Sequence, residues 1–534
     1  MTASRRIALV VLIAVISITL GARVLGPGDL YDKDQPKTMA GSADVALNGN
    51  WVWPRDMLRE PATKPPMFNW LDAVVLKLAP RWDEWTFKLP SILAAVIIGW
   101  LIVVMTRRLL REHPDADTIA LLAAAVWVAS APVAKQMYLS RPDMLITALL
   151  TGAWVCATRA MSEERAATRM ALGFWLSVAG AALSKGPAAL IPLVYVLVAI
   201  ALQRQWKPAR QLRAAWGVPL LLILLGGWAL LAYLHWPDAF WGVLKSEGAS
   251  RLMTGGPEAI AKPVWMTPMW FMSKFLPWSL AVLLALLMIG PTRWLQHELA
   301  PAIVWVVIAV VAFSIPPGKR PDYLLPAYPA AAILAAYGMV ELARRVRVPA
   351  GVVALAPLLM AAYLAHWELR RSPEAKSGYT RSLLAFTSDV RRIVPHDAKL
   401  VALVKGYQPT LSLLGRYDGN RARPDDLTPG TWVIAPRQFG WPAHATSNKL
   451  PDVIELGPKQ IVPGEVALYR VGDDGVTRNA LLAMLAEQYA WNFPPDRYRA
   501  SRDPAPPTSS PAGGGGGGGA TGGAEGAGGS GGGR

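Results

Sequence analysis

Residues 89–106 read LPSILAAVIIGWLIVVMT, an eighteen-residue run without a charged side chain, and Arg107, Arg108 and Arg111 follow it. A helix of this length rises about 27 Å, close to the roughly 30 Å hydrocarbon core of a bilayer. Arginines beside an apolar run are typical of the cytoplasmic border of a membrane. The run therefore predicts a helix that crosses a membrane.

Similar apolar runs recur along the first 366 residues. They predict eleven spans, near residues 7–26, 89–106, 118–135, 142–159, 170–184, 187–203, 215–234, 268–290, 300–316, 323–341 and 348–366. The fifth and sixth could instead be one helix broken around Lys185. Residues 1–26 also resemble a signal peptide, but no convincing cleavage site follows, so we expect an anchored span. The expected fold class is an all-α polytopic membrane protein.

The composition agrees with this fold class. Hydrophobic residues make up 53% and charged residues 17% of the 534 residues, against about 45–50% and about 25% in soluble proteins. The net charge is +17, but the basic residues fall mostly between apolar runs, which indicates topology signals rather than nucleic-acid binding. Cys156 is the one cysteine, so an intramolecular disulfide and a cysteine metal cluster are excluded.

The basic residues also predict the orientation. With the N-terminus in the cytoplasm, the cytoplasmic loops carry 16 Lys and Arg residues and the short external loops carry 5. Positively charged loops stay in the cytoplasm. We therefore expect a bacterial inner-membrane protein with long external loops at about 27–88 and 235–267, and with every residue after about 367 outside the cytoplasm.

Three domains are expected. Residues 1–366 form the transmembrane domain, with the external loop 27–88 as its catalytic loop. Residues 367–500 read as a small external α/β domain, and 501–534 form a disordered tail rich in proline and glycine. Within the small domain the patterns predict helices at 380–393 and 478–491 and strands at 399–404, 431–435 and 466–471.

Charged residues gather at membrane-proximal positions on the external side. Ionisable groups at membrane depth are costly, so a one-sided cluster indicates a functional site. Lys and Arg are the residues best suited to hold the phosphate of an anionic lipid. If that phosphate is a leaving group, nearby cations stabilise its developing charge, and one carboxylate suffices to activate a hydroxyl acceptor. Asp34 lies just past the first span; the external cations are Lys64, Arg141, Lys185, Arg251, Lys319 and Arg320.

The order of short motifs is informative as well. Asp34 is followed by Gly49-Asn-Trp-Val-Trp-Pro54, by Lys64-Pro-Pro and by Trp70. Later motifs follow at Arg141-Pro-Asp143, Lys185-Gly-Pro187, Glu247 with Arg251, Leu276-Pro-Trp278, and Lys319 with Pro321 and Tyr323. In this order, over about residues 1–345, the chain resembles the aminoarabinose-transferase and protein-mannosyltransferase-like membrane glycosyltransferases of the GT-C architecture.

The resemblance implies a function. It implies transfer of a sugar from a polyprenyl-phosphate donor to a hydroxyl of a glycolipid such as lipid A, a polysaccharide or a protein, with inversion, on the external face of the inner membrane. Asp34 would be the catalytic carboxylate, and the residues binding donor phosphate or sugar would be Lys64, Arg141, Lys185, Glu247, Arg251, Lys319 and Tyr323. Membrane lipid is the other expected partner, and nucleic acid is not expected.

The chain departs from the family pattern in two places. Gln35 follows Asp34 where the family usually has a glutamate, and the resemblance implies that Gln35→Glu would be tolerated. Thr63 and Ile260 stand where some aminoarabinose transferases have a Glu and a His as a possible metal pair. We therefore expect no metal site and no cofactor.

Other interpretations of these residues remain open. Asp34 could be a turn residue before Pro36, Lys64 and Lys185 could be interfacial anchors, and Glu247 with Arg251 could be a helical ion pair. For the whole chain, the alternative is a transporter or flippase of lipid-linked sugars without transferase activity. Transporters usually show repeated halves with a site near the midplane. The sequence shows no internal repeat, which favours the enzyme.

Overall fold

The structure is a computed structural model of the chain. It describes residues 3–26, 29–30, 34–56, 61–163, 167–203, 210–245, 262–370, 378–402, 408–416, 424–436, 445–446, 450–455, 461–464, 466–473, 478–479 and 481–482. Residues 1–494 form one compact unit.

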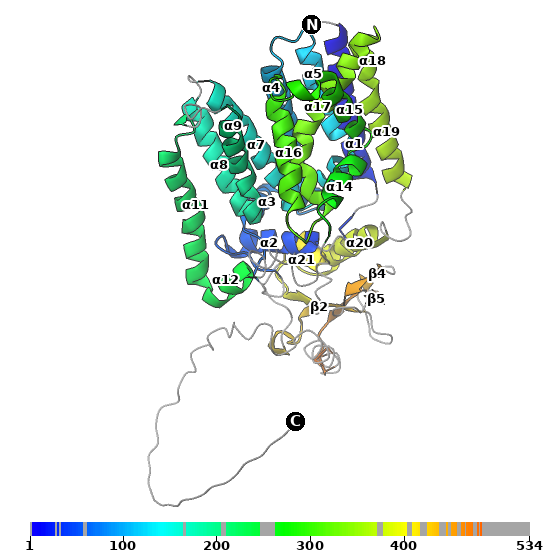
Figure 1. Cartoon of the computed structure of the whole chain (residues 1–534). Coiled ribbons are helices and arrows are strands. Elements are labelled where there is room, and N and C mark those ends of the chain that lie inside the picture. The colour runs from blue at the N-terminus through cyan, green and yellow to red at the C-terminus, as the bar shows by residue number, and fades with distance from the viewer. Residues whose placement is uncertain are drawn as a thin grey trace, which may run out of the picture. The chain divides into compact units, whose positions relative to one another are not determined.

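A bundle of roughly parallel and antiparallel helices makes up most of the described chain (Figure 1). Its members are α1 (Ala3–Leu25), α4 (Glu84–Leu109), α5 (Ala116–Val128), α6 (Ala131–Gln136), α7 (Pro142–Ser162), α8 (Ala167–Lys185), α9 (Ile191–Gln203), α11 (Ala214–His235), α14 (Met266–Lys274), α15 (Trp278–Ile289), α16 (Ala300–Ser314), α17 (Tyr328–Arg345), α18 (Ala350–Val353) and α19 (Leu355–Arg370). The chain is therefore an all-α polytopic membrane protein, as the sequence predicts.

Each of the eleven predicted spans overlaps apolar helices of the structure, but not all of these helices are long enough to cross a membrane. Among the described residues, seven helices are long and apolar enough to cross a membrane, or eight with the pair α14 and α15. The predicted spans at 118–135 and 300–316 correspond to shorter apolar helices, α5 and α16. The segment Ala167–Leu202 is one apolar stretch of 36 residues, which would rise about 54 Å, well beyond the hydrocarbon core. The stretch is interrupted by the 3-10 turn η2 (Gly186–Leu190), where Gly186 has φ +64°.

One predicted span has a different geometry. The sequence predicts a single helix over 268–290, but α14 and α15 meet at an angle of 105°. The chain turns there at the Leu276-Pro-Trp278 motif, because proline cannot continue a helical hydrogen-bond ladder. Such a break is tolerated at membrane depth where neighbouring helices satisfy the freed backbone groups.

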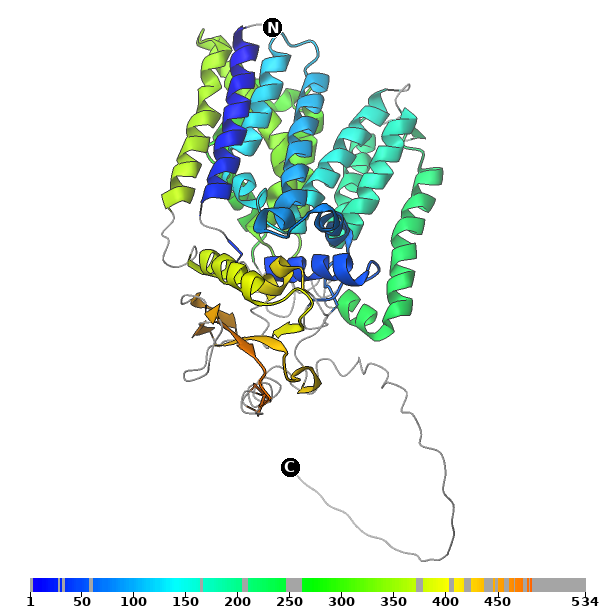
Figure 2. The same cartoon turned by 180° about the vertical axis from the view of Figure 1, so that it is seen from behind.

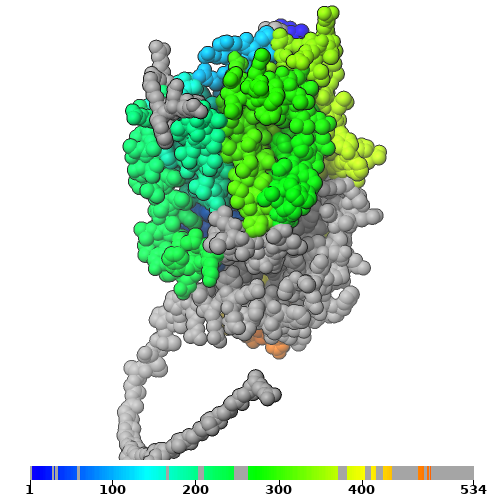
Figure 3. Space-filling model, viewed as in Figure 1, coloured from blue at the N-terminus to red at the C-terminus, as the bar shows by residue number. Residues whose placement is uncertain are grey.

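The bundle core combines large aromatic rings with close helix contacts. The rings of Trp154 and Trp305 stack with centroids 5.7 Å apart. A Cβ added to Gly338 on α17 would lie 2.6 Å from the carbonyl oxygen of Ala281 on α15, so only glycine permits this approach. Small residues at such crossings are typical of membrane helices, whose association depends on close van der Waals packing because the hydrophobic effect does not act between helices in lipid. By contrast, α11 lies at the edge of the bundle (Figures 1 and 3), and only 11% of its apolar window is buried.

Two helices in the expected first external loop cross one end of the bundle. They are α2 (Asp34–Asn48) and α3 (Met67–Leu78), and α2 runs across the axis of the long helices (Figure 2). Asn69 of α3 donates from Nδ2 to the carbonyl of Thr38 at 2.9 Å and to the Ser42 hydroxyl at 3.1 Å. This contact fixes the two helices to each other and thereby fixes the position of Asp34.

A small α/β part follows the last helix of the bundle. It contains α20 (Gly378–Ile393), α21 (Gln408–Leu414), a four-stranded sheet in the order β1 (Leu400–Ala402), β2 (Trp432–Pro436), β6 (Val466–Arg470), β3 (Ala445–Thr446), and a pair of β4 (Leu450–Glu455) with β5 (Ile461–Gly464). The short helix α12 (Pro237–Val243) and the 3-10 turns η4 (Pro291–Arg293), η5 (Pro321–Ala327) and η8 (Pro424–Asp426) complete the elements.

The predicted helix at 380–393 and the three predicted strands match α20, β1, β2 and β6. Most of the predicted helix at 478–491 lies outside the described residues, as does the tail at 501–534. Residues of this part share an apolar core with the first external loop, for example Phe386 with Leu76. The Arg391 guanidinium reaches the Trp82 carbonyl and lies 3.3 Å from Asp83. The domain boundary at 366 stays a prediction.

Candidate active site

Asp34 is the first residue of α2. Its carbonyl accepts a hydrogen bond from the Thr38 hydroxyl at 2.9 Å, as in a first helical turn. The side chain is 53% exposed, and its Oδ2 lies 2.9 Å from Arg141 Nη2 and 3.8 Å from Arg320 Nη1. Asp34 is thus more than a turn residue, since side chains from two distant segments converge on it.

Arg141 joins Asp34 to a second carboxylate. It directly precedes α7, which begins at Pro142, a residue favoured at the first helical position. Its side chain is only 9% exposed, and its Nε lies 3.5 Å from Oδ2 of Asp143. A guanidinium offers donors on two edges, so it can contact both carboxylates at once, which an ammonium on a flexible stem does less well.

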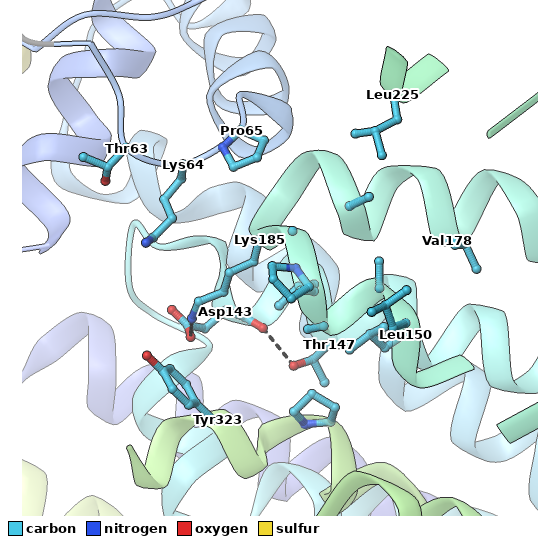
Figure 4. A pocket seen from close by; sticks show the side chains of 18 of the residues that line it. Thr63, Lys64, Pro65, Asp143, Thr147, Leu150, Val178, Lys185, Leu225 and Tyr323 are labelled. Carbon is cyan, nitrogen blue, oxygen red and sulfur yellow. Dashed lines mark hydrogen bonds and ion pairs between the residues drawn. The ribbon is translucent and has the colours of Figure 1, made fainter. Parts of the chain in front are cut away.

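Asp143 is buried and also binds Lys185. The ammonium of Lys185 lies 2.5 Å from Asp143 Oδ1 and 5.0 Å from the ring centroid of Tyr323. Lys185 ends α8 directly before the Gly186 turn, so the chain break aims its side chain inward. Lys64 also acts electrostatically on Asp143, and Figure 4 shows its ammonium pointing toward the same place. Two helices, α7 and α8, and the loop before α3 therefore bring these charges together.

These residues lie at one end of a cavity of about 770 Å³. Lys64, Lys185, Asp143 and Tyr323 cluster at this polar end, whereas leucine and valine side chains line the other end (Figure 4). The apolar lining includes Ile146, Leu150, Val178, Ala182, Leu193, Leu221, Leu225 and Phe313. A cavity of this kind suits an amphiphile with an anionic head and a hydrocarbon tail.

A tight turn holds Lys64 in place. The carboxylate of Asp44 on α2 accepts hydrogen bonds from Asn50 Nδ2 at 2.9 Å and from the Arg55 backbone N–H at 2.7 Å. The indole of Trp53 donates to the carbonyl of Ala62 at 2.9 Å, two residues before Lys64. The Gly-Asn-Trp-Val-Trp-Pro motif thus positions the cation rather than supplying chemistry itself.

The structure places the predicted site residues in three groups. Asp34, Arg141, Lys185, Lys64 and Tyr323 converge at the polar end of the cavity and its border. Lys319 is buried, and its ammonium donates to the Lys262 carbonyl at 2.6 Å. Lys319 is not among the described residues that line the cavity, although Gly318 is. Glu247 and Arg251 lie outside the described residues.

The sequence-based site set omits two carboxylates that the structure brings to the cavity. Asp143 binds two cations, and Asp322 lines the cavity beside Tyr323. Asp143 belongs to the Arg141-Pro-Asp143 motif, and its place at the second residue of an apolar span is a signal for it. Nothing in the sequence distinguishes Asp322 from the other loop charges.

The described residues contain no group of three or more His, Cys, Asp or Glu side chains arranged for a metal ion. Thr63, which stands where some relatives of the resembled family have a glutamate, lines the cavity next to Lys64. The absence of a metal site and a cofactor stays a prediction.

Comparisons with known proteins point to one family. Residues 63–230 match a family model described as dolichyl-phosphate-mannose-protein mannosyltransferase. An undecaprenyl phosphate-alpha-4-amino-4-deoxy-L-arabinose arabinosyl transferase of Proteus mirabilis is 23% identical over 60% of this chain and 57% of its own length. The corresponding enzyme of Pseudomonas aeruginosa strain LESB58 is 24% identical over 79% of this chain and 74% of its own length.

Solved structures show the same fold. ArnT from Cupriavidus metallidurans bound to undecaprenyl phosphate superposes with a TM-score of 0.64 at 15% identity, covering 86% of this chain and 97% of that chain. The Archaeoglobus fulgidus oligosaccharyltransferase in its apo form gives a TM-score of 0.51 at 12% identity, covering 80% and 69%. The family match, these relatives and the multi-pass helical fold agree with one another, and the chain is similar to the aminoarabinose-transferase and protein-mannosyltransferase-like membrane glycosyltransferases of the GT-C architecture.

Proposed function

We propose that the protein transfers a sugar from a polyprenyl-phosphate donor to an acceptor hydroxyl on the external face of the bacterial inner membrane. The observation that carries this proposal is an apolar cavity with a cationic end. The Arg141 guanidinium links Asp143, at that end of the cavity, to the exposed carboxylate of Asp34. The relatives' names and their undecaprenyl-phosphate complex support the class of donor.

The donor would bind by its two chemically different ends. The polyprenyl chain would lie against the apolar lining formed by residues such as Leu150, Val178 and Leu225. The phosphate would lie near Lys64 and Lys185, because ammonium groups make strong charge-assisted hydrogen bonds with phosphate oxygens. Tyr323, whose hydroxyl points toward the same end in Figure 4, would add a neutral hydrogen bond.

Asp34 would act as the general base of a single displacement. The proton of the acceptor hydroxyl passes to the carboxylate, and the hydroxyl oxygen bonds to the anomeric carbon of the sugar. The bond between that carbon and the phosphate oxygen breaks, and polyprenyl phosphate leaves. One displacement inverts the anomeric configuration. A phosphate leaving group needs no proton, so the surrounding cations stabilise the transition state and no general acid is required.

The orientation follows from the same proposal. The end of the bundle that carries Asp34, α2 and α3 would face outward, with the N-terminus in the cytoplasm. A reporter fused after Trp367 should then be active only outside the cytoplasm. Cytoplasmic activity of that fusion would place the site on the cytoplasmic face of the membrane and contradict transfer to an external acceptor.

The acceptor would be a glycolipid such as lipid A, a polysaccharide or a protein. The description of the family model names a protein acceptor, whereas the relatives' names give the donor and no acceptor, so the sequence likeness supports the reaction more than the acceptor. The exposure of Asp34 agrees with any acceptor that arrives from the external side.

A transport function without transfer remains the alternative. Purified full-length protein would be incubated with lipid-linked sugars and candidate acceptors, and free polyprenyl phosphate and glycosylated acceptor would be measured. Stoichiometric release of polyprenyl phosphate with acceptor glycosylation supports the enzyme. Translocation of intact donor across vesicles without its consumption would support the flippase and contradict the proposal.

A further inference from the structure

Among the described residues, one carboxylate that lines the cavity has no hydrogen-bond or ion-pair partner. Asp322 lies in the η5 turn directly before Tyr323 and lines the cavity. Within the part of the chain that the structure describes, no hydrogen bond or ion pair joins its carboxylate to another residue. The other carboxylate of the lining, Asp143, is engaged by Arg141 and Lys185. Asp322 therefore has hydrogen-bond acceptor capacity that the described residues leave unused.

The position of Asp322 indicates which part of a ligand it would meet. Arg320, two residues earlier, lies 3.8 Å from Asp34, so one short loop reaches both the candidate base and the cavity. The apolar lining, with Leu150, Val178 and Leu225, lies at the opposite end (Figure 4). A group beside Asp322 would thus lie between the leaving phosphate and the acceptor, where a transferred sugar has to be.

The charge of Asp322 is unfavourable for a phosphate alone. A second negative charge in a cavity with an apolar lining repels a bound phosphate, and a partly buried carboxylate without a donor loses solvation. Both costs are offset when the ligand itself supplies a hydrogen-bond donor. Sugar hydroxyl and ammonium groups are such donors, whereas a bare polyprenyl phosphate has none besides its own acid proton.

We propose that Asp322 accepts a hydrogen bond from a hydroxyl or ammonium group of the transferred sugar, and so distinguishes the glycosylated donor from polyprenyl phosphate. This inference rests on the proposed function and adds a residue that determines donor specificity. It also favours product release, because the phosphomonoester product carries more negative charge near neutral pH than the phosphodiester donor.

The test measures equilibrium binding to the full-length protein in detergent. The ligands are undecaprenyl phosphate, polyprenyl-phosphate mannose, which carries only hydroxyls, and the undecaprenyl-phosphate aminoarabinose donor, which carries an amine. Wild type is compared with Asp322→Ala and Asp322→Asn, and with Glu112→Gln as a control at an exposed carboxylate. Asp322→Ala should reduce the preference for glycosylated over bare lipid by roughly tenfold or more, the size of a lost charge-assisted contact.

The two variants identify the donor group on the sugar. Asparagine keeps an acceptor oxygen, so Asp322→Asn should retain most of the preference if a hydroxyl is bound and little of it if an ammonium is bound. The inference is overturned if Asp322→Ala shifts the affinity for bare and glycosylated lipids equally, because Asp322 would then make no contact that distinguishes the two lipids. If the wild-type protein binds none of the three lipids, the proposed function itself fails.

Discussion

The guanidinium of Arg141 donates from Nη2 to Oδ2 of Asp34 across 2.9 Å, although the two residues are 107 positions apart in the chain. The same side chain reaches Asp143, which lines the cavity. The candidate base and the candidate phosphate site are therefore coupled through one side chain. A change at Arg141 should affect catalysis beyond the loss of one positive charge.

Replacing Arg141 by lysine tests this coupling. Lysine keeps the charge but presents one compact ammonium, which does not replace both contacts of the planar guanidinium. We expect kcat to fall by roughly tenfold or more, because the base loses its fixed position, while donor binding changes less. Steady-state rates at saturating donor check this. Wild-type kcat in Arg141→Lys would show that the position of Asp34 does not depend on the bridge.

The donor phosphate should depend on Lys64. Lys64→Ala removes an ammonium from the polar end of the cavity and should weaken donor binding by about 1.5–3 kcal/mol, or roughly 10-fold to 150-fold in Kd. Lys37→Ala is the matched control, because Lys37 is an exposed cation on α2 away from the cavity lining. Equal affinities of the two variants would argue against Lys64 as a phosphate ligand.

Gln35 has a structural role that the family likeness does not suggest. Its Nε2 donates to the Asp29 carbonyl at 2.7 Å, and its Oε1 accepts from the Ser140 N–H at 2.9 Å. Gln35→Glu removes that donor and adds a negative charge 3.4 Å from the Asp29 carboxylate. We now expect this variant to lose about 1–3 kcal/mol of stability. Thermal unfolding in detergent measures the loss, with the exposed Glu112→Gln as reference; an unchanged Tm would restore the tolerance that the resemblance implies.

Asp72 on α3 should make stability depend on pH. Burial raises the pKa of its carboxyl well above the usual value, against a smaller opposing effect of the Ser42 hydroxyl. The folded protein therefore holds this proton above the pH at which the unfolded chain releases it, so stability falls as pH rises from about 4. Asp72→Asn removes the cost and should raise the Tm by a few degrees, on the order expected for about 1 kcal/mol, at pH 7.5.

The gain from Asp72→Asn should shrink as the pH approaches 4, because the unfolded wild-type chain then also begins to hold the proton. Melting curves of the two proteins between pH 4.5 and about 8 give this difference directly. A gain that stays constant across that range would mean that the asparagine acts by packing rather than by removing an ionisable group.

The helices of the bundle follow from apolar runs long enough to cross a bilayer, and the strands β2 and β6 follow from short β-branched and apolar runs. Local sequence patterns do not predict the 105° angle between α14 and α15, because the packing of neighbouring helices determines the direction in which the chain continues after the proline. These patterns do not predict the helices α2 and α3 either, since short helices in a polar loop give only a weak periodicity of apolar residues.

The sequence predicts the residue types of the candidate site. Charged residues at membrane depth are costly and are kept mainly at functional sites. On this basis the sequence predicts one site that contains Asp34, Lys64, Arg141, Lys185 and Tyr323. It does not predict their pairing, because hydrogen bonds such as that of Arg141 with Asp34 depend on the tertiary fold. Lys319 illustrates the difference, since its ammonium meets a backbone carbonyl beside the cavity loop.

The most direct test of the account is the turnover of Asp34→Asn with a lipid-linked sugar and a defined acceptor. Asparagine keeps the size and a hydrogen-bond acceptor but cannot take the acceptor proton. Turnover should fall by about 10²–10⁴-fold, while folding and donor affinity stay close to those of the wild type. Near-normal transfer by Asp34→Asn, in an assay where the wild type is active, would contradict the assignment of Asp34 as the general base.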